Sequence, residues 1–122
     1  MLNLGVTLSH GLRFVGIIDV SKNTFYSKLA ENKANLVTKS EEEQFVADLI
    51  AIKKTQSKFD AKLGKVVFTH VRREKVQQLV FQINEIILYV TCEPEIEHNT
   101  IVEISKLITD TIKNRHLDRL YL

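Results

Sequence analysis

Four basic side chains could form a binding site for an anion, because they fall close together in the sequence. Arg72, Arg73 and Lys75 occupy four consecutive positions with Glu74, and Lys65 precedes them. Arginine binds the oxygens of phosphate or carboxylate groups through two parallel hydrogen bonds. The cluster therefore predicts a contact with a phosphate group or an acidic protein surface. The alternative is a solvated turn between two strands. Nucleic acid is the weaker candidate, because this stretch lacks the interleaved aromatic residues on which bases stack.

A second pair of charged residues brackets the first predicted strand. Arg13 and Asp19 are six positions apart, so they would lie on the same face of a regular strand. They could supply the polar groups of a ligand pocket. The alternative is that both are strand-end charges in contact with water.

We find no motif that would assemble a catalytic centre, a metal site or a nucleotide-binding loop. The four histidines are scattered over different predicted elements: His10, His70, His98 and His116. Cys92 is the only cysteine, so it cannot form a disulfide within the chain, and the adjacent Glu93 disfavours a reactive thiolate. We therefore expect neither enzymatic activity nor a cofactor nor a bound metal.

The length of 122 residues predicts a single domain spanning 1–122, with a weakly structured N-terminal segment, 1–11, and a C-terminal tail, 117–122. The N-terminus has no basic region of a signal peptide, and no apolar run is long enough to cross a membrane. We expect a soluble, cytoplasmic protein.

Charge is distributed unevenly along the chain, although the net charge is only +2. Residues 53–75 contain eight basic and two acidic side chains, whereas residues 76–105 contain five glutamates and neither lysine nor arginine. Such asymmetry can steer a charged partner or let two copies meet head to tail. If the charges point to different faces, it has no such consequence.

Five segments have the pattern of β-strands. Residues 12–20 and 24–30, separated by the turn residues 21–23, predict a hairpin. Residues 65–71, 75–83 and 86–93 follow one another with connections too short for a crossover helix, which predicts an antiparallel meander. Asn84 and Glu85 form the second of these connections, and the apolar segment 86–93 is typical of a central strand.

Two helices are predicted by capping boxes followed by apolar residues at helical spacing. Ser40 with Glu43 would begin a long amphipathic helix over 41–63, and Thr100 with Glu103 would begin a second helix that ends near residue 116. Gln56 falls on the apolar stripe of the first helix. It is either a buried polar contact or, as we expect, a sign that the helix extends past the sheet.

Together these elements predict an α+β fold with one five-stranded antiparallel sheet, in the order β-β-α-β-β-β-α. Two helices are too few to cover both faces of such a sheet fully. One face or one edge should therefore be left for a partner.

This order resembles the profilin-like architecture shared by roadblock/dynein-light-chain, longin and PAS-type domains. More narrowly, the segments "LRFVGIID", "KFDAKLGKVVF", "VRREKV" and "FQINEIILYVTCEPE" resemble a family of small archaeal proteins whose function is not established. The resemblance covers about residues 12–108. Roadblock domains usually open with a further helix, which only residues 1–11 could supply here. We find no helical period in that segment.

Each resemblance implies a different role. The roadblock resemblance implies a non-catalytic scaffold that forms a homodimer and contacts small GTPases or their signalling complexes. The PAS resemblance implies a sensor that encloses a small molecule between the sheet and the long helix. The roadblock role is our main hypothesis and the PAS role is the alternative. A third hypothesis is phosphate or nucleic-acid binding through the basic turn, which contains Arg72, Arg73 and Lys75.

Overall fold

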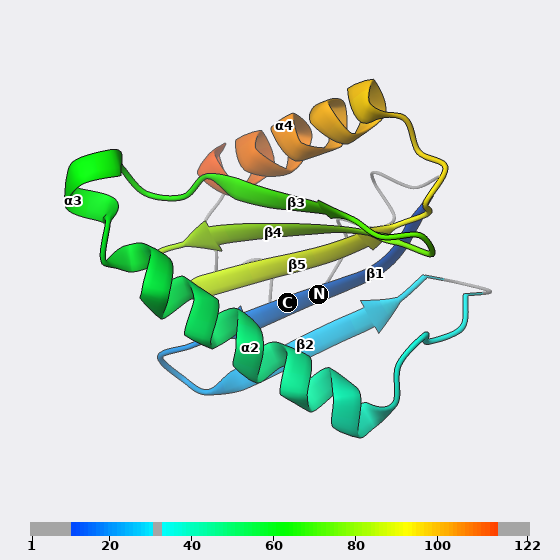
Figure 1. Cartoon of the computed structure of the whole chain (residues 1–122), viewed down its shortest axis with the longest axis horizontal. Coiled ribbons are helices and arrows are strands. Elements are labelled where there is room, and N and C mark those ends of the chain that lie inside the picture. The colour runs from blue at the N-terminus through cyan, green and yellow to red at the C-terminus, as the bar shows by residue number, and fades with distance from the viewer. Residues whose placement is uncertain (1–10, 31–32, 115–122) are drawn as a thin grey trace.

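Five antiparallel strands form one sheet in the order β2-β1-β5-β4-β3 (Figure 1). The computed structural model describes residues 11–30 and 33–114. The strands are β1 (Leu12–Asp19), β2 (Thr24–Leu29), β3 (Phe68–Arg72), β4 (Gln77–Ile83) and β5 (Ile86–Cys92). The predicted five-stranded antiparallel sheet is confirmed. The segments 1–10 and 117–122 lie outside the described residues, as do His10, His116 and the predicted end of the last helix.

An asparagine in the left-handed conformation lies in each of two hairpin connections of the sheet. Asn23 has a φ of 54° between β1 and β2, and Asn84 has a φ of 53° between β4 and β5. Asparagine tolerates this left-handed conformation better than most residues, which explains its place in both turns. The hairpins predicted at 21–23 and 84–85 are therefore present.

β5 is the central strand, with β1 on one side and β4 on the other. Its near-continuous apolar sequence suits this position, because both of its faces are covered. Leu88 has no exposed surface on the face that carries α4, and Ile87 is 1% exposed on the face that carries α2.

One helix covers each face of the sheet (Figure 1). The helix α4 (His98–Asn114) contributes Ile101, Ile104 and Ile108 to an apolar cluster with the side chains on its face of β1, β4 and β5. The helix α2 (Lys39–Ser57) contributes Leu49 to a second cluster on the opposite face, with Ile18, Val80 and Ile87. The strands β1, β4 and β5 thus divide their alternate residues between two cores.

Both helices begin earlier than their predicted caps. Thr38 caps α2: its hydroxyl accepts a hydrogen bond from the backbone of Glu41, and the Glu41 carboxylate accepts one from the Thr38 backbone. The capping box predicted at Ser40 is therefore wrong by two residues, since Thr38 offers the same chemistry one half-turn earlier. Thr100 likewise lies inside α4 and is not its cap.

The predicted helix over 41–63 is interrupted. α2 ends at Ser57, and a short helix, α3 (Asp60–Leu63), follows after a break at Lys58 and Phe59. Beyond the break the apolar side chains no longer face the sheet: Phe59 is 54% exposed and Leu63 is 81% exposed. The apolar spacing alone did not reveal this, because it continues unchanged through the break.

Gln56 makes the polar contact that we considered less favoured. Its side-chain oxygen accepts a hydrogen bond from the amide of Gln82 on β4. The last turn of α2 is therefore tied to the sheet, and the helix does not extend past it.

The two edges of the sheet, β2 and β3, have no further strand beside them in the part of the chain that the structure describes. Within residues 11–30 and 33–114, no helix is long and apolar enough to span a membrane.

Candidate functional site

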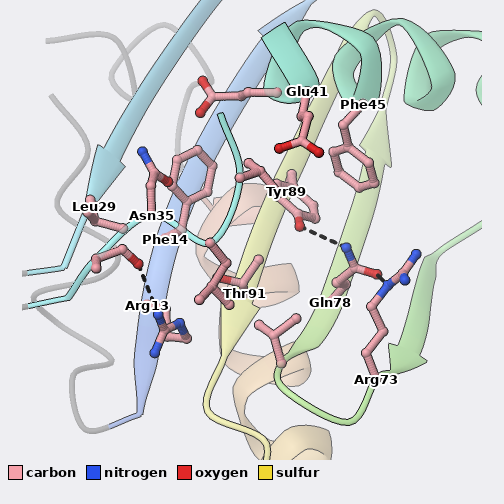
Figure 2. A pocket seen from close by; sticks show the side chains of 15 residues that line it. Arg13, Phe14, Leu29, Asn35, Glu41, Phe45, Arg73, Gln78, Tyr89 and Thr91 are labelled. Carbon is pink, nitrogen blue, oxygen red and sulfur yellow. Dashed lines mark hydrogen bonds between the residues drawn. The ribbon is translucent and has the colours of Figure 1, made fainter. Parts of the chain in front are cut away.

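A pocket of about 290 Å³ opens between α2 and the sheet (Figure 2). Its wall on the helix side comes from the first two turns of α2 and from the segment 34–37 that precedes the helix. Its floor comes from the ends of β1, β4 and β5. The side chains on the floor share the face that carries α2, and they are Phe14, Gln78, Tyr89 and Thr91.

Aromatic rings form the apolar part of this pocket. The ring of Tyr89 lies between those of Phe45 on α2 and Phe14 on β1, with centroid separations of 4.8 and 5.9 Å. Both pairs are tilted, an arrangement that aromatic quadrupoles favour. Leu36 and Val37, both exposed, form the apolar rim.

A chain of hydrogen bonds leads from the basic turn into the pocket (Figure 2). Arg73 Nε donates to Gln78 Oε1 at 2.8 Å, and Gln78 Nε2 donates to the Tyr89 hydroxyl at 3.0 Å. Burial raises the pKa of Tyr89 above its usual value, although the Gln78 hydrogen bond and the Arg73 charge oppose this. The phenol is therefore protonated at neutral pH, and its O–H remains able to donate.

Thr91 places a second hydroxyl on the pocket floor. It follows Tyr89 by two positions on β5, so both side chains project from the same face of the strand. Thr91 is only 8% exposed, and its hydroxyl has no hydrogen-bond partner among residues 11–30 and 33–114. A buried hydroxyl without a partner is uncommon and costs free energy.

Arg13 lines the same pocket, and its role as a ligand group stays a prediction. Its Nη1 atom lies 2.7 Å from the Glu93 carboxylate, and its Nη2 atom donates to the carbonyl oxygen of Ala34 at 3.0 Å. Lys33 also contacts Glu93, at 3.0 Å. Burial raises the pKa of Glu93, but the hydrogen bonds from Lys33 and Arg13 outweigh it and hold this pKa below its usual value. The charge of Arg13 is thus already paired.

Asp19 lies at the other end of β1, about 20 Å along the strand, and does not line the pocket. Its carboxylate accepts hydrogen bonds from the Ser21 hydroxyl and the Lys22 backbone, and the Ser21 contact chiefly lowers its pKa. The pairing of β1 with β5 is irregular between Leu12 and Phe14, which breaks the simple alternation that placed Arg13 and Asp19 on one face. The structure does not bring these two residues together.

The four predicted anion contacts, Lys65, Arg72, Arg73 and Lys75, are likewise not all brought together by the structure. The backbone N–H of Arg73 bonds to the carbonyl of Val76 at 2.9 Å and closes the turn between β3 and β4. Arg72, Arg73 and Lys75 are exposed around this turn. Lys65 precedes β3, so it lies at the opposite end of that strand. Only three of the four predicted anion contacts are therefore neighbours, and their role as such stays a prediction.

Two residues considered for chemistry are explained by packing. His70 Nε2 lies 2.8 Å from the Gln77 side-chain oxygen, which can only accept a hydrogen bond, so His70 is a donor there. Cys92 has no exposed surface, and burial, with a smaller effect of Glu93, raises the pKa of its thiol to about 12. No group of three metal-ligating side chains occurs in the described part of the chain.

The pocket residues that we did not anticipate are those whose partners are distant in sequence. Phe14, Phe45, Gln78, Tyr89 and Thr91 each fit the pattern of a strand or helix, which hid their common location. One sequence signal was available: Gln78 and Thr91 are polar residues on strands whose remaining side chains are largely apolar.

Comparison with known proteins shows the fold of the chain. A roadblock/LC7 domain from Streptomyces avermitilis superimposes with a TM-score of 0.60 over 93% of this chain and 95% of its own, at 9% identity. The gliding protein MglB from Thermus thermophilus gives a TM-score of 0.66 over 91% and 83%, at 14% identity. An MglB structure described as having a tetrameric arrangement gives 0.66 over 91% and 82%, also at 14% identity.

No protein-family model and no curated protein matches the sequence. The chain therefore has the roadblock/LC7 fold, as expected from the order of its elements. At these identities the likeness is one of fold alone. The resemblances to PAS domains and to the archaeal family stay predictions.

Proposed function

We propose that the chain is a non-catalytic protein-interaction module of roadblock type, which forms a homodimer through the outer edge of β3. Such a dimer would serve a small GTPase or a signalling complex as a regulatory platform. The roadblock/LC7 fold supports this role, and one observation about the surface supports it most directly.

That observation is the unpaired edge of β3 and the apolar side chains beside it. β3 pairs only with β4 in the described part of the chain, so its outer N–H and C=O groups have no strand partner there. Large exposed apolar side chains follow one another from the second half of α2 through α3 into β3. We call them the exposed apolar stretch, and they are Ile52, Phe59, Leu63, Val67, Phe68 and Val71.

An exposed edge strand with apolar side chains is a template for pairing with another strand. The other edge of the sheet is less suited to this, since β2 exposes Ser27 and Lys28 there. Lysine on an edge strand opposes pairing.

A second copy of the chain is the partner that we infer for this edge. Two β3 strands related by a two-fold axis would pair antiparallel, and each exposed apolar stretch would face its symmetry mate. A tetrameric arrangement is described for one MglB structure, a protein of the same fold. This assembly supports, by analogy of fold, an oligomer for the present chain.

The proposal of a GTPase partner is based on the roadblock fold and not on any contact described above. Isothermal titration of the purified chain with small GTPases from the same organism, loaded with GDP or a GTP analogue, tests it. Binding to one loaded form would support the regulatory role. Absence of binding to every GTPase in both forms would remove that part of the proposal.

Homodimer formation is tested by sedimentation velocity between 1 and 100 μM, an order-of-magnitude range for specific association. Phe59→Glu and Leu63→Glu place charge in the exposed apolar stretch and should weaken dimerisation at least tenfold. Leu107→Glu is the matched control, because Leu107 is 47% exposed on α4, on the other face of the sheet. It should dimerise like the wild type.

Neither test position supports the fold of the monomer strongly, since both side chains are more than half exposed. Circular dichroism should therefore show folded variants. A wild-type chain that stays monomeric at 100 μM, or variants that dimerise like Leu107→Glu, would contradict the proposed interface.

A further inference from the structure

The pocket beside α2 contains polar groups whose hydrogen-bonding capacity is not used within the protein. The hydroxyl of Thr91 has no partner among residues 11–30 and 33–114, although the residue is 92% buried. The Tyr89 hydroxyl accepts from Gln78 but has no acceptor for its own proton in the same part of the chain. Two donors thus project from one face of β5 into one cavity.

The two hydroxyls come from residues whose Cα atoms lie about 6.6 Å apart along the strand, the rise of two residues. One small group with two acceptor oxygens, placed between them, could accept a hydrogen bond from each. Phe14, Phe45 and the aliphatic rim supply the apolar walls, and the other polar side chains of the lining include Asn35, Glu41 and Glu42.

Arg73 is the cation that is joined to the free hydroxyls, because Gln78 links its guanidinium to the Tyr89 oxygen. Arg13 is paired with Glu93. The carboxylates of Glu41 and Glu42 also line the pocket and keep their charge, since the bond that Glu41 accepts comes from the neutral backbone N–H of Thr38. At the Tyr89 hydroxyl the effect of Arg73 is larger than that of Glu42, and it favours an acceptor with negative charge there.

The hydrogen-bond chain strengthens this preference. Arg73 polarises the amide of Gln78, whose N–H donates to the Tyr89 oxygen. A phenol that accepts a hydrogen bond becomes a better donor through its own O–H. This series of hydrogen bonds thus transmits the effect of the exposed Arg73 guanidinium to the partly buried hydroxyl of Tyr89.

We propose that this pocket binds a small carboxylic acid with an apolar body, whose carboxylate accepts hydrogen bonds from the hydroxyls of Tyr89 and Thr91. The aromatic walls enclose the apolar body, and Arg73 supplies the counter-charge. The volume of about 290 Å³ lies at the lower end of the range of small-molecule pockets, roughly 300–1,000 Å³, and suits a ligand of the size of phenylacetate. This inference goes beyond the proposed dimer and does not depend on it.

Three probes of similar shape test the proposal by isothermal titration and by amide chemical shifts: phenylacetate, phenylacetamide and phenethylamine. Phenylacetate should bind most tightly, phenylacetamide at least fivefold more weakly, and phenethylamine not at all. The amide keeps one acceptor oxygen but lacks the charge, and the amine has the wrong charge.

Thr91→Val and Tyr89→Phe each remove one hydroxyl and keep the shape of the side chain. Each should weaken phenylacetate binding about tenfold, as expected for the loss of a hydrogen bond to a charged acceptor. Thr69→Val is the matched control: Thr69 lies on β3, on the same face of the sheet, and does not line the pocket. Arg72→Gln is a second control, because it removes a charge next to Arg73 from a residue that does not line the pocket. Both control variants should bind phenylacetate like the wild type.

Thr91→Val also separates binding from structure. Because its hydroxyl has no partner in the described part of the chain, its removal should leave the unfolding midpoint of the ligand-free protein unchanged or raise it. The dimer-weakening variant Leu63→Glu should bind phenylacetate like the wild type. Failure of all three probes to bind at 10 mM, a concentration on the order of the weakest useful affinity, would overturn the proposal. So would equal phenylacetate binding by Thr91→Val, Tyr89→Phe and the wild type.

Discussion

The guanidinium of Arg13 and the carboxylate of Glu93 form an ion pair of 2.7 Å that joins the start of β1 to the residue after β5. The two residues are 80 positions apart, so the contact exists only once β1 has paired with the central strand. Lys33 binds the same carboxylate oxygen at 3.0 Å and connects the segment before α2 to it. One carboxylate thus ties three parts of the chain together at the pocket rim.

Acid should weaken this ion pair. The folded pKa of Glu93 lies below its unfolded value of about 4.3, so its contribution is complete above that value and is lost as the pH falls through the folded pKa. Glu93→Gln should therefore lose less free energy of unfolding than the wild type between about pH 5 and pH 3. The difference should not exceed about 1 kcal/mol, because solvent screens the pair.

Urea denaturation at a series of pH values measures this difference. Glu95→Gln is the control, since Glu95 is exposed and its side chain forms no hydrogen bond or ion pair within residues 11–30 and 33–114. Parallel pH profiles of Glu93→Gln and the wild type would show that the ion pair adds nothing to stability.

The position of the cap of α2 can be tested by comparing two hydroxyl residues. Thr38→Ala removes the side chain that accepts from the Glu41 backbone, and it should cost about 1 kcal/mol. Ser40→Ala alters an exposed residue inside the first turn and should change the free energy of unfolding by less than about 0.5 kcal/mol. The reverse order, measured by urea denaturation, would place the cap at Ser40, where the sequence pattern predicted it.

Gln77 should be important for stability although it is polar. It is 1% exposed, and its Nε2 atom contacts the carbonyl oxygens of Glu93, Pro94 and Ile96 at 3.2, 3.3 and 2.8 Å. Its oxygen meanwhile accepts from His70. Gln77→Leu would leave these buried groups without partners and should cost roughly 1–3 kcal/mol.

Gln44→Leu is the matched control for Gln77→Leu, because Gln44 is exposed on α2. Thermal unfolding distinguishes the two variants. Hydrogen exchange should also become faster in residues 93–97 of Gln77→Leu, since the amide holds that segment against β4. Equal stability of the two variants would show that the segment is held by other contacts.

Local patterns were sufficient to predict the strands, their hairpins and the central place of residues 86–93. The alternation of Leu79, Phe81 and Ile83 predicted one face of β4, and these residues do pack toward α4. Asn84 predicted its turn because the backbone conformation that it adopts is a property of the residue itself. Helix boundaries were less accurate, because Thr38 and Ser40 offer the same capping chemistry and only packing on the sheet selects between them.

The periodicities of the amino-acid sequence are sufficient to predict the five strands, the two main helices and the class of fold. The pairing of β1 with β5 could not be predicted in this way, and it places Phe14 next to Thr91 and Arg13 next to Glu93. The break of α2 before Phe59, which leaves that side chain exposed, could not be predicted either. Strand order and helix position follow from burying both faces of one sheet at once. That free energy belongs to contacts between residues far apart in sequence, which no local pattern contains.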